Sequence, residues 1–350
     1  MDTTKKRRSP VSTRLIDDLE RRICSGEFAA NTMLPSIRVL AAEYSASPRT
    51  VESALRKMCE NLSLQRVPNR GFKVLEHEAI GNAKIAVIYQ AHGSSDPRPE
   101  IGAAICDRLE QYGYSYDAFD VLMRTVEPAY LKENYAAVIF ARQFYRADIS
   151  RQLSELGVRQ VIAGLETPSE LPASFVDRAA LIDSTLHMLY DMGHRNIALV
   201  ARSTDKYFYP QMIRQYHQSM EELGLDHSDA TIAVMERDFE LGAYLCGREL
   251  LTRPRRPSVI IVSRDYQACG VHQACLEAGL TVGKDISLIG YDDIGWPAGH
   301  EVLTTYVEPC RELGSTAVEI LRSILNGDHA SLQREVKPVL KMRKSLTPLL

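Results

Sequence analysis

The side chains best suited to contact a charged partner lie in one short helical pattern near the start of the chain. The stretch SASPRTVESALRKM has apolar residues at i, i+3, i+4 and i+7, which predicts a helix with one apolar stripe. Ser47 is a good N-cap and Pro48 suits the first helical position, so the helix start is well defined. Arg49 then lies in the first turn and Arg56 on the polar side. Cations placed in this way can contact an anionic partner such as a phosphate backbone.

Enzyme motifs are absent from the sequence, so we expect no enzymatic activity, no cofactor and no metal. The loop HGSSD at 92–96 holds a candidate nucleophile and an acid, but no G-x-S-x-G elbow surrounds it. Neither G-x-G-x-x-G nor a Walker A sequence occurs. The seven cysteines include no C-x-x-C pair, and Cys269 and Cys275 do not have the spacing of metal ligands.

The distribution of charge separates the start of the chain from the rest. The chain has 350 residues, 45% hydrophobic and 25% charged, which is typical of a soluble protein of two or three domains. Residues 1–78 hold 14 Lys and Arg against 10 Asp and Glu, whereas the remainder holds 28 against 35. This asymmetry favours a nucleic-acid contact at one end. No apolar run reaches the ~18 residues of a membrane span, and the start MDTTKKRRSP lacks the apolar region of a signal peptide, so we expect a cytoplasmic protein.

The elements that position the cations of the first segment are three helices and a hairpin. A first helix is predicted over 12–25, a second opens after LPS at 34–36, and the third begins at Pro48. SLQRV and FKVLE flank the turn PNRG, which predicts a β-hairpin. Three helices and a two-stranded wing form the winged helix-turn-helix layout, in which a recognition helix enters the major groove of DNA. We therefore predict a DNA-binding domain over 1–78, with the third helix as its recognition helix.

After a small-residue link at 79–83, the pattern changes to alternating strands and helices. Apolar runs predict strands at 84–89, 136–141, 160–164, 196–201, 231–235, 258–262 and 286–290. Helical patterns lie between most of them, for example at 178–193, 211–223, 239–251 and 266–278. Such an alternation implies parallel sheets covered on both faces. The number of strands predicts an α/β fold with two Rossmann-like lobes and a ligand cleft between them.

The first 76 residues resemble the DNA-binding domain of the GntR family. The resemblance is carried by LPSIRVLAAEYSASPRTVESAL and, after it, RVPNRGFKV. It implies DNA contacts from the second helix, the third helix and the wing tip, namely Arg38, Ser47, Arg49, Thr50, Arg70 and Gly71. The polar face of the third helix adds Arg56 to this set. The sequence departs from the family pattern at Ile37, Pro48 and Glu52, and an acid such as Glu52 would be repelled by phosphates.

Residues 84 to about 345 resemble the sensor half of the LacI/GalR repressors, which has a type I periplasmic-binding-protein-like fold. The motifs are DMGHRNIALV at 191–200, the run from 258 to 294, and VLTTYVEPCRELGSTAVEIL at 302–321. A GntR-type reader on a LacI-type sensor is similar to the arabinose repressor architecture. The resemblance implies a dimeric transcription factor that is controlled by an effector.

The same resemblance divides residues 84–350 into two lobes of an effector-binding domain. Lobe 1 is expected to comprise about 84–177 and 307–325, and lobe 2 about 178–306 and 326–350.

The resemblance to the LacI/GalR sensors also implies a set of ligand-binding side chains. Asp292 matches a carboxylate that binds sugar hydroxyls. The aspartate that often ends another strand in the family aligns near Gly164, and Glu166 lies just beyond that position. Arg214 is two places from Met212, where an arginine is usual, and Arg264 replaces a usual asparagine. Arg264 would either bind an acidic or phosphorylated ligand, since guanidinium groups bind such anions bidentately, or pair with a neighbouring acid.

Aromatic rings could complete this site. Tyr207 and Phe208 lie in a loop just before a helix, where they would either stack on a sugar or fill a domain interface.

The combined patterns predict a transcriptional regulator, and specifically a repressor. It would bind a pseudo-palindromic double-stranded DNA operator as a homodimer, because two-fold protein symmetry needs two half-sites. A sugar or sugar derivative between the lobes would control DNA binding. Two alternatives stay open. One is a regulator whose cleft no longer responds to sugars, as Met212 and Arg264 suggest, and the other is a small-molecule binding protein on the same fold.

Overall fold

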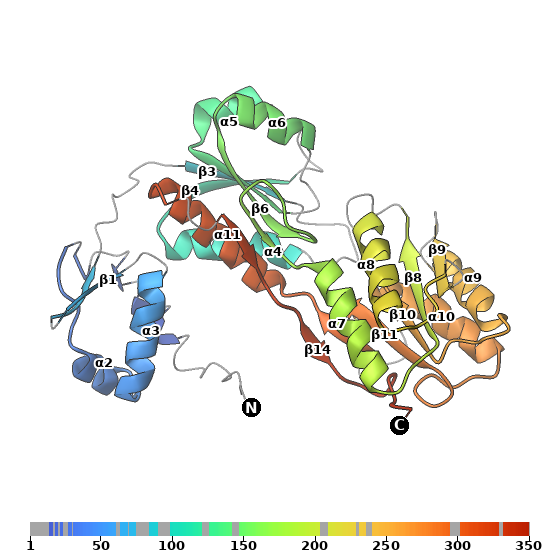
Figure 1. Ribbon diagram of the computed structural model, residues 1–350. Helices are drawn as coiled ribbons and strands as arrows, with labels where there is room; N and C mark the ends of the chain where they lie inside the picture. The colour runs from blue at the N-terminus through green and yellow to red at the C-terminus, as the bar shows by residue number, and fades with distance from the viewer. Residues whose placement is uncertain are drawn as a thin grey trace.

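The computed structural model contains a small N-terminal domain and two lobes of similar architecture (Figure 1). The residues that it describes are 14–16, 18–19, 22–23, 27–29, 31–60, 64–68, 70–74, 84–89, 99–120, 126–141, 147–203, 209–228, 231–235, 240–294, 302–328 and 332–349. Within these residues the chain forms one two-stranded sheet and two six-stranded sheets. No helix in these ranges is long and apolar enough to cross a membrane.

Two helices of the N-terminal domain each begin directly after a serine N-cap. α2 (Ile37–Glu43) begins after Ser36, whose hydroxyl accepts a hydrogen bond from the main-chain N–H three residues on. α3 (Pro48–Glu60) begins after Ser47, whose hydroxyl accepts from the N–H of Thr50 at 3.1 Å. The predicted N-cap and the proline at the first helical position are confirmed. A serine hydroxyl in this place satisfies one of the N–H groups that a helix start leaves without a partner.

The wing is a hairpin of β1 (Leu64–Val67) and β2 (Gly71–Val74), paired antiparallel as predicted. The wing and the helices share one apolar core, which includes Leu15, Leu19, Ile23, Leu40, Val51, Leu55, Met58, Leu64 and Phe72. Leu15, Leu19 and Ile23, which belong to the first helix predicted over 12–25, are therefore buried.

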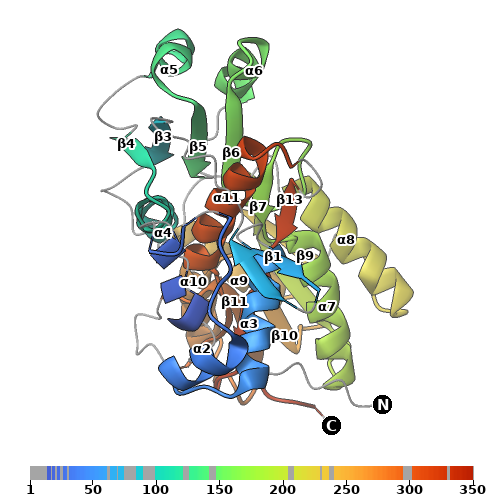
Figure 2. The ribbon, with the colours of Figure 1, turned by 90° about the vertical axis from the view of Figure 1, so that its left-hand side faces the viewer.

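Lobe 1 is built on a six-stranded parallel sheet with the order β13-β7-β6-β5-β3-β4. Its strands are β3 (Lys84–Tyr89), β4 (Ser115–Asp120), β5 (Ala137–Ala141), β6 (Arg159–Leu165), β7 (Ala173–Phe175) and β13 (Gln333–Glu335). Its helices are α4 (Pro99–Gln111), α5 (Pro128–Asn134), α6 (Ala147–Glu155) and α11 (Cys310–Leu325). The helices α4 and α11 pack on one face of the sheet and α5 and α6 on the other (Figure 2), which gives one apolar core on each side.

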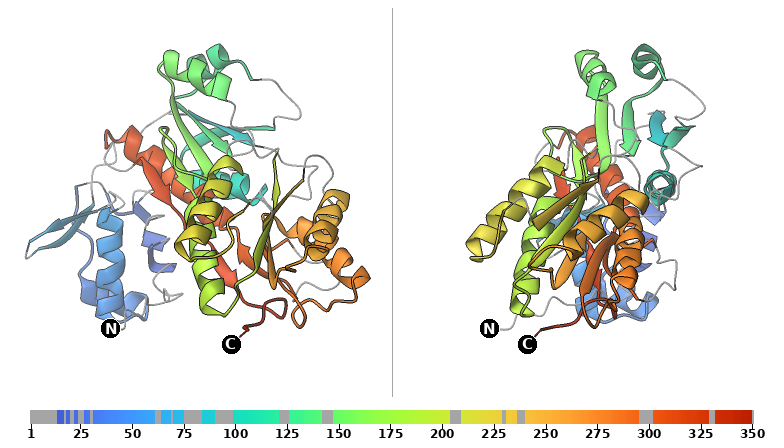
Figure 3. Two further views of the ribbon diagram at one scale, coloured as in Figure 1. Left: turned by 45° about the vertical axis from the view of Figure 1, so that its right-hand side comes forward. Right: turned by 90° about the vertical axis from the view of Figure 1, so that its right-hand side faces the viewer.

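Lobe 2 has a second six-stranded sheet with the order β14-β12-β11-β10-β8-β9. Its strands are β8 (Ile197–Arg202), β9 (Ile232–Met235), β10 (Val259–Val262), β11 (Ser287–Asp292), β12 (Thr304–Val307) and β14 (Val339–Lys341). Its helices are α7 (Arg178–Asp191), α8 (Tyr209–Glu222), α9 (Glu240–Leu251) and α10 (Asp265–Glu277). The helices α7 and α8 cover one face and α9 and α10 the other (Figure 3). All pairs are parallel except β12 with β14.

The chain passes between the lobes three times: from β7 to α7, from β12 to α11, and from β13 to β14. The third passage corrects the predicted division, which assigned 326–350 to lobe 2. Residues 333–335 pair in parallel with β7 and extend the lobe 1 sheet, so the chain returns to lobe 2 only with β14. β13 joins lobe 1 because β7 would otherwise be the edge strand of the sheet, with main-chain N–H and C=O groups that no strand pairs.

Candidate functional sites

The first candidate site is the outer side of the helix-turn-helix. Arg38 lies in the first turn of α2 and Arg49 in the first turn of α3, and both side chains are exposed. The hydroxyls of Ser47 and Thr50 lie 2.8 Å apart and fix the polar surface where α3 begins. A helix start presents unpaired N–H groups and the positive end of the helix dipole, so this surface suits an anion such as a phosphate.

Arg56, the second predicted contact on α3, is engaged by an acid of the same helix. Its Nη2 lies 2.8 Å from Oε1 of Glu52 one turn earlier, and both side chains are solvent-accessible. The hydrogen bond from Arg56 lowers the pKa of Glu52. The acid that would repel phosphates is thus partly neutralised, and Arg56 would have to exchange this partner for DNA.

The wing tip carries the remaining predicted contacts. Arg70 is exposed in the turn between β1 and β2. Gly71 has φ of +110°, in a region that other residues adopt at a cost, and a Cβ there would lie 3.6 Å from the Met33 side chain. The glycine therefore fixes the shape of the tip that presents Arg70.

The second candidate site lies where strands of both lobes end. Arg264 follows β10, Asp292 is the last residue of β11, and Glu308 follows β12, all in lobe 2. Glu166 follows β6 in lobe 1. Carboxyl ends of parallel strands form the edge at which ligands of open α/β sheets bind, so these side chains lie where the sequence predicts the ligand cleft.

A buried guanidinium group is the centre of this cluster of charged side chains. Arg264 Nη1 donates to Asp292 Oδ1 at 2.7 Å and lies 3.9 Å from Glu308 Oε2, while Nη2 donates to Glu166. The exposed fractions of the Arg264, Asp292 and Glu308 side chains are only 5%, 4% and 2%. Because Glu166 belongs to lobe 1, Arg264 forms a direct ionic contact between the lobes. Of the two readings that the sequence left open, the structure shows the pairing with neighbouring acids.

A second buried arginine connects the passage between the lobes to the same site. Arg178 begins α7, and its main-chain N–H donates to the carbonyl oxygen of Glu166 at 3.1 Å. Its Nη2 donates to the carbonyl of Ser263 at 2.8 Å, and its guanidinium carbon lies 3.2 Å from the centre of the Tyr291 ring. Burial raises the pKa of Tyr291. These contacts fix the ends of β10 and β11 beside the start of α7.

The end of β11 is held in an unusual conformation. Asp292 and Asp293 both have positive φ, 117° and 60°. Asp293 donates its main-chain N–H to Asp265 at 2.8 Å, and Asp265 also accepts from the Thr305 hydroxyl at 2.7 Å. Burial raises the pKa of Asp265 to about 7. At Gly290 a Cβ would lie 2.1 Å from Asp265 Oδ1, so only glycine leaves room for this carboxyl group. Backbone strain of this kind is concentrated at functional sites.

The other ligand residues expected from the sequence are not brought into this cluster. Arg214 is exposed on α8, and Met212 is buried in the lobe 2 core. Tyr207 and Phe208 lie outside the described residues. Sequence analysis missed Arg178 and Glu308. A signal for them was present, since each is a charged residue directly beside a point where the chain passes between the lobes.

These features define a class of protein: a winged helix-turn-helix domain joined to a two-lobed, periplasmic-binding-protein-like domain whose lobes meet at a cluster of charged side chains. The matches to protein families agree. Residues 11–74 match the family "Bacterial regulatory proteins, gntR family", and residues 186–346 match "Periplasmic binding protein-like domain". The chain therefore combines a GntR-type helix-turn-helix domain with a sensor domain of the kind found in LacI-family repressors.

Individual relatives match about half of the chain. The ribose operon repressor of Escherichia coli (strain K12) is 32% identical over 170 residues, 48% of each chain. The repressor PurR of Photobacterium profundum is 31% identical over 169 residues, 47% of this chain and 50% of that one. The chain spans about half the length of these relatives, which are named as transcriptional regulators.

Solved structures show the same fold. A regulatory protein of the LacI family from Chloroflexus aggregans aligns with a TM-score of 0.64 at 21% identity, covering 76% of this chain and 99% of that one. A LacI family transcriptional regulator from Enterococcus faecium with bound ribose aligns with a TM-score of 0.60 at 20% identity, covering 76% and 100%. At these identities the likeness concerns the fold.

Proposed function

We propose that this protein is a DNA-binding transcriptional repressor whose operator binding is controlled by a small metabolite held between the two sensor lobes. The observation that supports it most directly is the ionic contact of Arg264 with Glu166 between the lobes, because it links the relative position of the lobes to the occupancy of the site. A ligand that changes this contact changes the lobe arrangement. Such a switch works only if the ligand has different affinities for the two arrangements.

The DNA contacts in this proposal come from the N-terminal domain. Arg38, Arg49 and Arg70 are exposed on α2, α3 and the wing. Arg49 would reach base edges from the recognition helix, whereas Arg38 would contact phosphate and position the domain. Ser47, Thr50, Arg56 and Gly71 complete the proposed surface.

A homodimer would place two such domains on an operator with two half-sites. Lobe 2 offers a surface for the second copy, because Leu241 and Leu245 of α9 are 55% and 52% exposed and Leu276 of α10 is 53% exposed. Leu241 and Leu245 lie one turn apart on α9, which packs on α10, and exposed leucines on one helix face favour a protein partner. The protein would act in the cytoplasm, where it would bind DNA.

The proposed effector is a neutral sugar or sugar derivative. The carboxylates Asp292, Glu166 and Glu308 surround one guanidinium group, and carboxylates accept hydrogen bonds from hydroxyls. An acidic ligand would have to displace one of these carboxylates from Arg264. The relative with bound ribose makes sugars the first class to test.

The experiment is fluorescence anisotropy of the protein on DNA from upstream of its own and neighbouring genes, with and without a panel of sugars, sugar acids and sugar phosphates. Release of specific DNA by one compound is the expected result. Specific binding that responds to no sugar would instead support a second candidate function, a regulator without a sugar response. The burial of Met212 in the lobe 2 core favours that candidate, because the resemblance to the LacI/GalR sensors implies a ligand-binding arginine at this position.

A further inference from the structure

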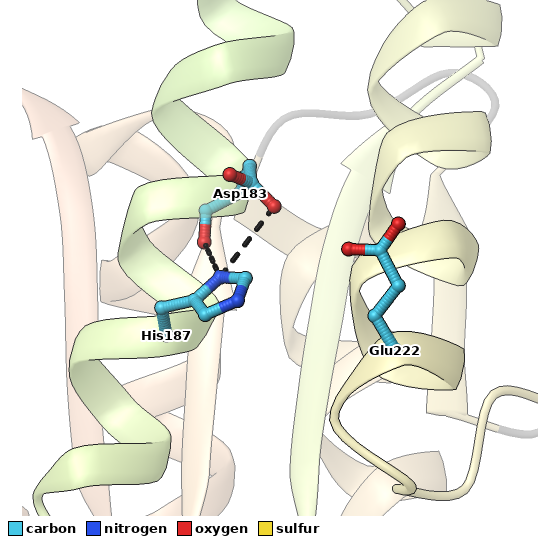
Figure 4. A group of neighbouring side chains, drawn as sticks. All are labelled: Asp183, His187 and Glu222. Carbon is cyan, nitrogen blue, oxygen red and sulfur yellow. Dashed lines mark hydrogen bonds and ion pairs between the residues drawn. The ribbon is translucent and has the colours of Figure 1, made fainter.

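A group of potential metal ligands lies in lobe 2 between α7 and α8. Asp183 and His187 are four residues apart on α7, and Glu222 ends α8. One donor atom of each residue lies within 4.8 Å of the donors of the other two. Figure 4 shows the Glu222 carboxylate pointing across the gap between the helices toward the α7 pair.

The imidazole ring of this group is held in place through its Nδ1. This atom lies 3.0 Å from the main-chain oxygen of Asp183 and 3.5 Å from its Oδ1 (Figure 4), and only an N–H can make the contact with the main-chain oxygen. In the neutral ring the lone pair is then on Nε2. Ligating histidines almost always donate their other N–H to a carbonyl or carboxylate in this manner.

Polar neighbours also orient the two carboxylates. The Ser219 hydroxyl, which is fully buried, donates to Asp183 Oδ1 at 2.6 Å. Gln218 Nε2 donates to one oxygen of Glu222 at 2.9 Å. Each carboxylate has a second oxygen, so these contacts leave both groups able to coordinate an ion.

The backbone that carries the group is rigid. Leu186 of α7 and Tyr216 and Met220 of α8 are fully buried in the same lobe 2 core. Helix positions that are fixed by packing hold ligands more precisely than loops do. A shared ion would need bonds of about 2.0–2.2 Å to its ligands. The three donor atoms would come that close to one ion if the exposed His187 and Glu222 side chains rotated.

We propose that Asp183, His187 and Glu222 bind one divalent transition-metal ion, with Zn²⁺ as the best fit, and that the ion connects α7 to α8. One imidazole nitrogen and two carboxylate oxygens are Zn²⁺ ligands, whereas Ca²⁺ and Mg²⁺ take oxygen ligands. Three protein ligands leave a fourth position to water, in keeping with the exposure of the site. This proposal is independent of the regulatory function.

The test is titration of the full, chelator-treated protein with ZnCl2 by calorimetry, together with its thermal midpoint. The described cysteines are also potential zinc ligands, so variants are needed to show which residues bind the ion. We expect His187→Ala and Glu222→Gln each to lower the affinity of one site at least about tenfold, as the loss of a ligand or its support does. The matched control is His227→Ala, an exposed histidine outside the group.

The expected outcome is one site that is lost in both variants and kept in the control, with a zinc-dependent rise of the thermal midpoint that disappears with it. Zinc binding that is the same in His187→Ala and in the control would overturn the proposal. Absence of any zinc-dependent change in the wild-type protein would overturn it as well.

Discussion

Replacing Arg264 by methionine tests whether the buried guanidinium group holds the two lobes together. At the 2.7 Å separation of Arg264 Nη1 and Asp292 Oδ1, the Coulomb attraction is about 6 kcal/mol for an effective dielectric constant of about 20. Desolvation of each buried ion costs several kcal/mol, so the pair contributes little net stability. Removing only the cation is different, because the carboxylates stay buried without it, and this costs about 3–5 kcal/mol.

The assay for Arg264→Met is urea unfolding followed by fluorescence and by circular dichroism. Arg311→Met is the matched control, because Arg311 forms a 2.9 Å pair with Asp107 in which the side chains are 67% and 52% exposed. An exposed pair of this kind contributes at most about 1 kcal/mol. The reasoning is refuted if the two variants lose the same free energy of unfolding.

A double-mutant cycle assigns part of this effect to the contact between the lobes. With Glu166→Gln as the second change, we expect a coupling energy of about 0.5–3 kcal/mol, as found for residues in one ionic network. A coupling energy of zero would show that Arg264 acts within lobe 2 alone, through Asp292.

Three further predictions concern single residues. Arg49→Ala should weaken operator binding and relax the discrimination at one base pair by about 1–3 kcal/mol; an equal loss on all DNA sequences in anisotropy titrations would show that Arg49 contacts only phosphate. Asp292→Ala should abolish the response to the effector while DNA binding persists, and an unchanged response would remove Asp292 from the site. Burial raises the pKa of Asp265 to about 7, above the ~3.9 of an aspartate in the unfolded chain. The folded state therefore binds more protons than the unfolded state between these two pKa values. The free energy of unfolding should fall as pH rises from about 4 to about 7. Asp265→Asn should flatten this dependence in urea unfolding at several pH values, and an unchanged slope would mean that the carboxyl group is ionised throughout.

The central strands were predictable because their burial is visible in the sequence. β3, β5, β8 and β10 are apolar along their length, since helices cover both faces of each sheet. The edge strand β4 was not predicted, because SYDAFD has no continuous apolar run and only Phe119 of its six residues is buried. The short strands β13 and β14 were missed for a related reason, since three residues carry too little pattern.

The sites were predictable only in part, because their members come from segments far apart in the chain. Arg264, Asp292 and Glu166 were expected in one cleft, and the structure joins them. The partner of Arg264 could not be chosen from the sequence, because the choice depends on how the lobes meet. In the zinc-ligand group, Asp183 and His187 have helical i, i+4 spacing, whereas Glu222 comes close only through the packing of α8 on α7.

The three passages of the chain between the lobes have a consequence for synthesis on the ribosome. Domains generally fold as units, N-terminal ones first, as the chain emerges. Lobe 1 cannot follow this order, because α11 covers one face of its sheet with Leu313, Ala317 and Leu321 and is made only after most of lobe 2. Lobe 2 in turn lacks its edge strand β14 until α11 and β13 have been synthesised. A nascent chain that stops near residue 300 therefore has two unfinished sheets, and the two lobes must complete their folding together.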